Sequence, residues 1–262
     1  MNDALISIEG LSKAFGGVLA VDGVSITVSR SRLTGIIGPN GAGKTTLLNL
    51  ISGLYAPTRG TIRIDGEDVA GMKPHQLARR GLTRTFQNLQ VFGSMTALEN
   101  VLVAIQAPHM RQYLRLALPL RRVRALEEQW HEEAMQGLAR VGLAAVAHRE
   151  AANLPYGSLK RLELARAVAL RPKCILLDEP AAGCNSAEAA ELMEVIREVV
   201  AGGVSTVLVE HNMKVVMGIC EDIVVLDGGR VLCTGSPEAV QADPRVITAY
   251  LGTATWGRTG HA

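Results

Sequence analysis

Hydrophobic residues follow several patterns along the chain, and each pattern predicts a different kind of element. Residues 4–12 and 23–29 alternate apolar and polar side chains, which is typical of antiparallel strands. Residues 173–180 and 204–211 hold short apolar runs that end in charged residues, as parallel strands buried on both faces do. From about residue 98 to residue 146 the pattern becomes helical. These patterns predict one α/β domain with an inserted helical subdomain.

The turn signals and the bulk composition agree with this arrangement. Asp227-Gly-Gly lies between two apolar runs within residues 223–235 and predicts a hairpin. The chain has 262 residues, a hydrophobic content of 48% and a net charge of +2, which does not suggest a nucleic-acid-binding protein. Its four cysteines show no metal-binding spacing, and its start lacks the features of a signal peptide. No apolar run approaches the ~18–20 residues that span a bilayer. We therefore expect a soluble protein of the reducing cytosol.

One glycine-rich segment predicts a phosphate site. Gly38-Pro-Asn-Gly-Ala-Gly-Lys44-Thr45 fits the P-loop pattern in full, between an expected strand and an expected helix. Glycines let the backbone N–H groups face an anion at the positive end of a helix. Lys44 would reach the β- and γ-phosphates, and the Thr45 hydroxyl would ligate Mg²⁺. The predicted nucleotide-binding residues here are Gly38, Pro39, Asn40, Gly41, Ala42, Gly43, Lys44, Thr45 and Thr46.

A second segment carries two neighbouring carboxylates. Asp178 and Glu179 follow an apolar strand pattern, as in a Walker B segment. Asp178 would hold Mg²⁺ through water, and Glu179 would be the base that polarises the attacking water. A solvated turn is the alternative for these two acids taken alone, and the P-loop favours the catalytic interpretation.

With both motifs present, the chain resembles the ATP-binding subunits of ABC transporters over nearly its whole length. Gln87 matches the family's Q-loop, which ligates Mg²⁺ and senses the transmembrane partner. His211 matches the switch histidine that contacts the γ-phosphate, and Phe15 matches the aromatic residue that stacks on adenine. The resemblance implies that Glu179, His211 and Gln87 are catalytic and that Thr45, Gln87 and Asp178 bind the metal. The implied cofactors are ATP and Mg²⁺.

The resemblance also implies the fold and its boundaries. It predicts a RecA-like P-loop core with a mainly parallel sheet, an N-terminal antiparallel β-subdomain and an inserted α-helical subdomain. The ATP-binding domain would cover residues 1–255. Within it we expect the core at about 1–90 and 168–235, the helical subdomain at about 91–167, and a C-terminal helix at about 236–252.

Residues 154–158, Leu-Pro-Tyr-Gly-Ser, occupy the position of the family's signature, which is usually Leu-Ser-Gly-Gly-Gln. In that family the signature covers ATP held by another subunit, so Tyr156, Gly157 and Ser158 would contact the partner's nucleotide. A helix N-terminus aimed at phosphate supplies partial positive charge and N–H donors. Pro155 replaces the serine and lacks an N–H, which we expect to weaken closure by about 1–3 kcal/mol. Whether that site hydrolyses ATP stays open.

Several stretches look like the ATPases of branched-chain amino acid importers. These are residues 154–167, 178–192, 210–229 and 235–252; the signature tyrosine, Tyr156, and Asn185, where many relatives carry aspartate, point the same way. That resemblance implies permease subunits, a second ATPase in a heterodimer or a homodimer, and indirectly a periplasmic binding protein, but no nucleic acid. It places the chain peripherally at the cytoplasmic face of the inner membrane. The alternatives are the ATPase of a lipopolysaccharide exporter and a non-transport ABC ATPase.

Overall fold

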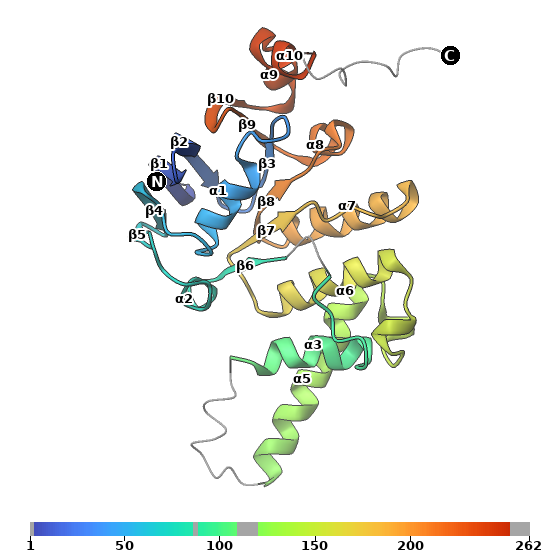
Figure 1. Ribbon diagram of the computed structural model, residues 1–262. Coiled ribbons are helices and arrows are strands. Elements are labelled where there is room, and N and C mark those ends of the chain that lie inside the picture. The colour runs from blue at the N-terminus through green and yellow to red at the C-terminus, as the bar shows by residue number, and fades with distance from the viewer. Residues whose placement is uncertain (1–2, 86–88, 109–119, 252–262) are drawn as a thin grey trace, which may run out of the picture.

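The computed structural model describes residues 3–85, 89–108 and 120–251, and Figure 1 shows its arrangement. In these residues the first sheet is antiparallel, with strand order β2-β1-β4-β5. β1 and β2 pair in the antiparallel manner that their alternating side chains predict. The strands of this sheet are β1 (Ala4–Phe15), β2 (Val18–Ser29), β4 (Arg59–Ile64) and β5 (Glu67–Asp68).

The second sheet has the order β10-β9-β3-β8-β7-β6. Five of its strands run parallel, and β10 returns antiparallel to β9 through the predicted Asp227-Gly-Gly hairpin. This confirms the predicted α/β fold, with its mainly parallel core sheet and its antiparallel N-terminal sheet. The strands are β3 (Leu33–Ile37), β6 (Leu82–Arg84), β7 (Cys174–Asp178), β8 (Ser205–Val209), β9 (Asp222–Asp227) and β10 (Arg230–Gly235).

The parallel strands are buried on both faces because two separate cores lie against them. In β7, Ile175 and Leu177 belong to the core that the helical region covers. Cys174 and Leu176, which alternate with them, belong to the core shared with α1 and the antiparallel sheet. All five residues of β7 and all five of β8 are buried. The uninterrupted apolar runs therefore reflect burial on both sides.

The helices form two groups (Figure 1). α3, α5 and α6 pack on one another at the end of the molecule away from the antiparallel sheet, whereas α1, α7 and α8 lie beside the parallel sheet. α3 begins at a capping box in which Thr96 and Glu99 bond each other's backbone N–H groups. The helices are α1 (Lys44–Ile51), α2 (Pro74–Ala78), α3 (Ala97–Gln106), α5 (Leu120–Arg140), α6 (Tyr156–Ala169), α7 (Ser186–Ala201) and α8 (Met213–Ile219).

The C-terminal region differs from the single helix expected at about residues 236–252. It contains two short helices, α9 (Pro237–Ala242) and α10 (Pro244–Leu251). Pro244 cannot donate a backbone hydrogen bond, and Asp243 before it adopts an extended conformation with ψ of 115°. The proline therefore divides the helix.

Candidate nucleotide site

The predicted P-loop connects β3 to α1, and two of its glycines lie against the backbone of other segments. A Cβ on Gly43 would lie 2.5 Å from the Ala20 carbonyl oxygen, and the residue has a φ of +96°. A Cβ on Gly38 would lie 2.2 Å from the Leu226 carbonyl oxygen. Both positions therefore require glycine. The loop borders a cavity of about 380 Å³ that is lined by Ala20, His211 and residues 40–46.

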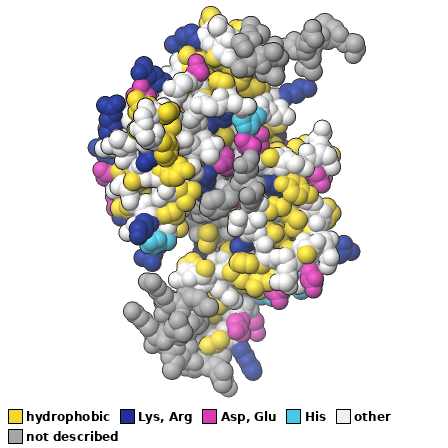
Figure 2. All heavy atoms as spheres, viewed as in Figure 1, with side chains coloured by type: hydrophobic (Ala, Val, Ile, Leu, Met, Phe, Trp, Pro, Cys, Tyr) yellow, Lys and Arg dark blue, Asp and Glu magenta, His cyan; other side chains and the backbone are white. Residues whose placement is uncertain are grey.

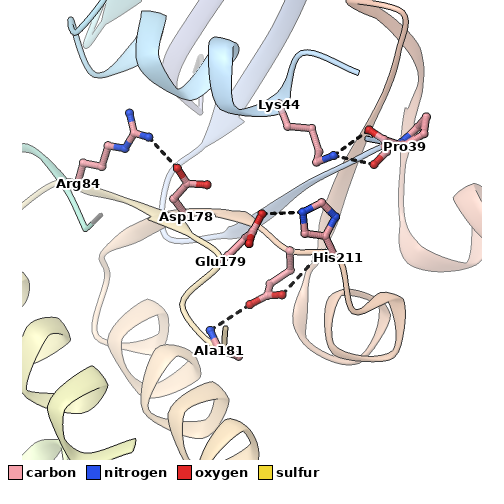
Figure 3. Close-up of polar contacts among 9 residues, drawn as sticks. Pro39, Lys44, Arg84, Asp178, Glu179, Ala181 and His211 are labelled. Carbon is pink, nitrogen blue, oxygen red and sulfur yellow. Dashed lines mark hydrogen bonds and ion pairs between the residues drawn. The ribbon is translucent and has the colours of Figure 1, made fainter. Parts of the chain in front are cut away.

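Lys44 is the first residue of α1, and its side chain is buried against the loop. The residue is 6% exposed, and its Nζ donates to the carbonyl oxygens of Gly38 at 2.8 Å and Pro39 at 3.0 Å. Burial lowers the pKa of Lys44, and the charges of Glu179 and Asp178 oppose that shift. The ammonium is thus held against backbone carbonyl oxygens at the start of the P-loop (Figure 3).

Asp178 and Glu179 point to opposite sides of the same strand end (Figure 3). Asp178 Oδ2 accepts from Arg84 Nη2 at 2.7 Å. Glu179 Oε1 lies 2.6 Å from His211 Nε2. The two predicted acids therefore bind different partners: Asp178 faces Arg84 of β6, and Glu179 faces His211 in the loop after β8.

Glu179 adopts an unusual backbone conformation at this position. Its φ is +49°, a region that non-glycine residues rarely occupy, and its N–H donates to the Val209 carbonyl oxygen at 2.9 Å. Such strain is often found where a side chain must be aimed at a functional site. Here it accompanies the contact between Glu179 and His211, which are 32 residues apart in sequence.

Glu210 is a further acidic residue of this site, and no sequence motif marks it. It is 7% exposed and accepts hydrogen bonds from the backbone N–H groups of Ala181 at 3.1 Å and His211 at 3.2 Å. Burial raises the pKa of Glu210, and these hydrogen bonds oppose the shift. Figure 2 shows acidic side chains and a histidine gathered near the middle of one face, beside α8. The only sequence signal was a glutamate directly before the predicted histidine.

Three aromatic residues come from distant parts of the chain, and one of them, Tyr250, contacts the P-loop. Phe15 at the end of β1 is 44% exposed and meets Tyr55 edge-to-face, with ring centroids 5.2 Å apart. Lys13 Nζ lies 5.2 Å from the Phe15 ring centroid. Tyr250 of α10 is 9% exposed and shares a hydrogen bond with the backbone of Gly38, while burial raises its pKa to about 12. Neither Tyr55 nor Tyr250 was predicted, because no local motif marks them.

The signature loop precedes α6, as predicted, and contacts the segment that follows β7. The Tyr156 hydroxyl donates to the Ala182 carbonyl oxygen at 3.2 Å, and the Gly157 N–H donates to Glu188 Oε1 at 3.3 Å. A Cβ on Gly157 would lie 2.7 Å from Glu188 Cγ, so this glycine is needed for a contact within the chain. Ser158 Oγ accepts from Arg161 Nη2 at 3.3 Å.

The predicted metal ligands have the chemistry of a Mg²⁺ site without forming a complete one. No group of three or more His, Cys, Asp or Glu side chains that could hold a metal occurs in the described residues. Asp178 and the Thr45 hydroxyl supply hard oxygen ligands, and Mg²⁺ usually completes its shell with water and substrate phosphates. The described residues thus fit an ion that arrives with a nucleotide. Gln87, the third predicted ligand, lies outside the described residues.

Comparison with known proteins identifies the family. The profile of the ABC transporter family matches residues 21–182, and that of the branched-chain amino acid ATP-binding cassette transporter matches residues 230–255. The chain is 43% identical to the high-affinity branched-chain amino acid transport ATP-binding protein BraF of Pseudomonas aeruginosa, over 97% of this chain and all of the relative. It is 36% identical to the lipopolysaccharide export system ATP-binding protein LptB of Acidithiobacillus ferridurans, over 95% of this chain and 97% of the relative.

Solved structures agree with this assignment. The ADP conformation of MJ1267, an ATP-binding cassette of an ABC transporter, matches with a TM-score of 0.82 and 32% identity, over 95% of this chain and 99% of that one. The dimer of the cassette MJ0796 bound to ADP and Pi matches with a TM-score of 0.72 and 25% identity, over 88% of this chain and 98% of that one.

The chain is an ABC transporter ATPase, as the P-loop and the fold around it indicate. Within that class it belongs to the family of branched-chain amino acid transport ATP-binding proteins, which confirms the resemblance seen in the sequence. Among the helices of the described residues, none is both long enough and apolar enough to cross a membrane.

Proposed function

We propose that this chain is a motor subunit that uses ATP to drive uptake of branched-chain amino acids or related small polar solutes through a membrane permease. The observation that carries the proposal is that Lys44 and His211 line one cavity at the start of α1 and that Glu179 contacts His211 there. Each of these side chains comes from a different segment, so their convergence is a property of the fold.

The residues would divide the work of hydrolysis as follows. Backbone N–H groups of residues 40–46 bind the phosphates, Lys44 exchanges its carbonyl partners for phosphate oxygens, and Phe15 stacks on the base. Glu179 accepts a proton from the attacking water, and His211 holds that carboxylate and contacts the γ-phosphate. A Mg²⁺ ion held by Thr45, Asp178 and Gln87 would neutralise charge on the phosphates.

Assembly explains the second predicted site. Tyr156, Gly157 and Ser158 lie at the N-terminus of α6, and we propose that this helix N-terminus covers a nucleotide bound by a partner ATPase. A heterodimer with a second ATPase is the favoured form, with two permease subunits and a periplasmic binding protein completing the importer. The chain would lie at the cytoplasmic face of the membrane.

Co-purification tests this proposal directly. Tagged Glu179→Gln protein, which should bind MgATP without hydrolysing it, is purified from native membranes and its companions are identified by mass spectrometry. Two multi-span permeases with a second, different ATPase support the importer. A lipid-exporting permease pair with two copies of this chain favours the exporter, and recovery only on ribosomes or nucleic acid overturns the transport function. Lys44→Ala, which should not bind nucleotide, is the matched control.

A further inference from the structure

Arg84 is an arginine with a buried side chain that joins β6, the end of β7 and the C-terminal end of α1. Its Nη2 donates to Asp178 Oδ2 at 2.7 Å, and its Nη1 donates to Asn49 Oδ1 at 2.6 Å and Ser52 Oγ at 2.9 Å. The arginine ends β6, Asp178 ends β7, and the other two residues lie at the end of α1. The side chains of Arg84 and Asp178 are each 8% exposed. Figure 3 shows the guanidinium directed at the aspartate, on the side away from Glu179 and His211.

This ion pair places a positive charge next to the Asp178 carboxylate in the absence of nucleotide. The guanidinium occupies one of the two carboxylate oxygens, and the pair is withdrawn from solvent, where the attraction between opposite charges is weakly screened. Lys44, a second cation of the site, directs its ammonium at carbonyl oxygens of the P-loop. A divalent cation that approached Asp178 alone would therefore meet a carboxylate whose charge is already balanced by Arg84.

We propose that Arg84 is a positioning residue and the resident counter-cation of the metal site, an inference that rests on the Mg²⁺ site proposed above. It orients and neutralises Asp178, so that a divalent cation binds well only when nucleotide phosphates bring additional negative charge. Arginine suits this task because its planar fork bonds the carboxylate and the end of α1 at the same time. The device ties uptake of the metal to uptake of the nucleotide.

The test measures how tightly the nucleotide-free, full-length chain binds Mn²⁺ at pH 8. The electron paramagnetic resonance signal of the unbound ion gives the fraction bound at each Mn²⁺ concentration. Arg84→Met removes the charge and keeps a side chain of similar length. We expect it to bind Mn²⁺ at least about tenfold more tightly than wild type, because an unpaired buried carboxylate gains most from a new cation. Arg84→Gln is a second neutral variant, with the same expected direction.

Three controls separate a charge effect from a structural one. Arg84→Lys keeps the positive charge without the fork and should retain the Mn²⁺ affinity of wild type. Adding Asp178→Asn to Arg84→Met should remove the gain. Arg80→Met disrupts an exposed ion pair with Glu67, 3.1 Å long, and should leave Mn²⁺ affinity unchanged. Thermal unfolding reports which variants are folded.

Equal Mn²⁺ affinity in wild type and in a folded neutral variant would overturn the proposal. A gain that persists after Asp178→Asn would overturn it as well. If neither neutral variant folds, the lysine variant decides, because tighter Mn²⁺ binding with the charge still present contradicts the counter-cation role and unchanged binding supports it. If Asp178 is not part of the metal site at all, Asp178→Asn should hydrolyse MgATP at the wild-type rate. That result would overturn the proposed metal site and is distinct from the outcomes that concern Arg84.

Discussion

The phosphate cavity and the signature loop are both built at the N-terminus of a helix, yet they differ in what surrounds them. At α1, charged side chains from β7 and from the loop after β8 converge on the P-loop. At α6, the loop contacts the Ala182 carbonyl oxygen, the Arg161 guanidinium and the carboxylate of Glu188, which accepts from the Gly157 N–H. The first region gathers its predicted catalytic side chains within one chain, whereas the second presents a helix N-terminus held by contacts within the chain.

The two regions are nevertheless connected through one short segment. Residues 179–188 begin at the predicted base Glu179 and end at Glu188, and both signature contacts to Ala182 and Glu188 fall within them. One continuous stretch of ten residues thus carries both the predicted base and the two contacts that hold the signature loop.

Glu179→Gln should have the strongest effect on ATP hydrolysis, and the substitution changes a side chain of the phosphate site only. Loss of the general base should slow ATP hydrolysis by about 10²–10⁴-fold while nucleotide affinity stays within about twofold of wild type. Phosphate release at saturating MgATP and titration with a fluorescent nucleotide measure the two quantities separately. Hydrolysis at the wild-type rate would contradict the assignment of Glu179.

The second effect concerns the link between the regions. Gly157→Ala places a Cβ 2.7–2.9 Å from three carbon atoms of Glu188 and should destabilise the fold by about 1–3 kcal/mol. Urea-induced unfolding measures this loss. Because Glu188→Ala removes the two nearest of these atoms, Cγ and Cδ, the double variant should be less destabilised than the sum of the single variants. Strict additivity would show that the contact does not matter.

Pro155→Ser restores the residue usual in the family's signature and should act on the second region. Serine is a better helix N-cap than proline, so α6 and the isolated chain should gain about 1 kcal/mol in unfolding free energy. The hydroxyl would also strengthen closure over the partner's ATP by about 1–3 kcal/mol. Urea-induced unfolding of the isolated chain measures the first gain, and nucleotide trapping in the assembled complex measures the second. If neither gain is seen, Pro155 weakens neither the helix nor the closure.

The smallest effect is a difference in thiol reactivity that reports closure. Burial raises the pKa of Cys174 and of Cys220 to about 12, so at pH 8 both thiols stay protonated and should not react with an aromatic disulfide reagent. The pKa values of Cys184 and Cys233 are also raised by burial, but both residues are partly exposed and should react slowly. MgATP-driven assembly of Glu179→Gln should protect Cys184, which lies between Glu179 and Glu188, and leave Cys233 as the internal control.

Local patterns in the sequence predicted the P-loop, the strands buried on both faces and the start of α6, because each depends on neighbouring residues. The contacts that complete the site were not predictable in this way. Arg84 and Asp178 are 94 positions apart, and Tyr250 reaches Gly38 from the end of the chain. The break before Pro244 was visible in the sequence and was missed in favour of one continuous helix.

This chain holds its own nucleotide site, and we expect ATP turnover there to depend on partner subunits. ATP affinity and ATP turnover of the wild-type chain are measured first alone and then with the membrane complex recovered by co-purification. We expect affinity to change little and turnover to rise at least about tenfold when a partner covers the bound nucleotide. A turnover that partners do not alter, or a chain that binds no ATP without them, would contradict this expectation.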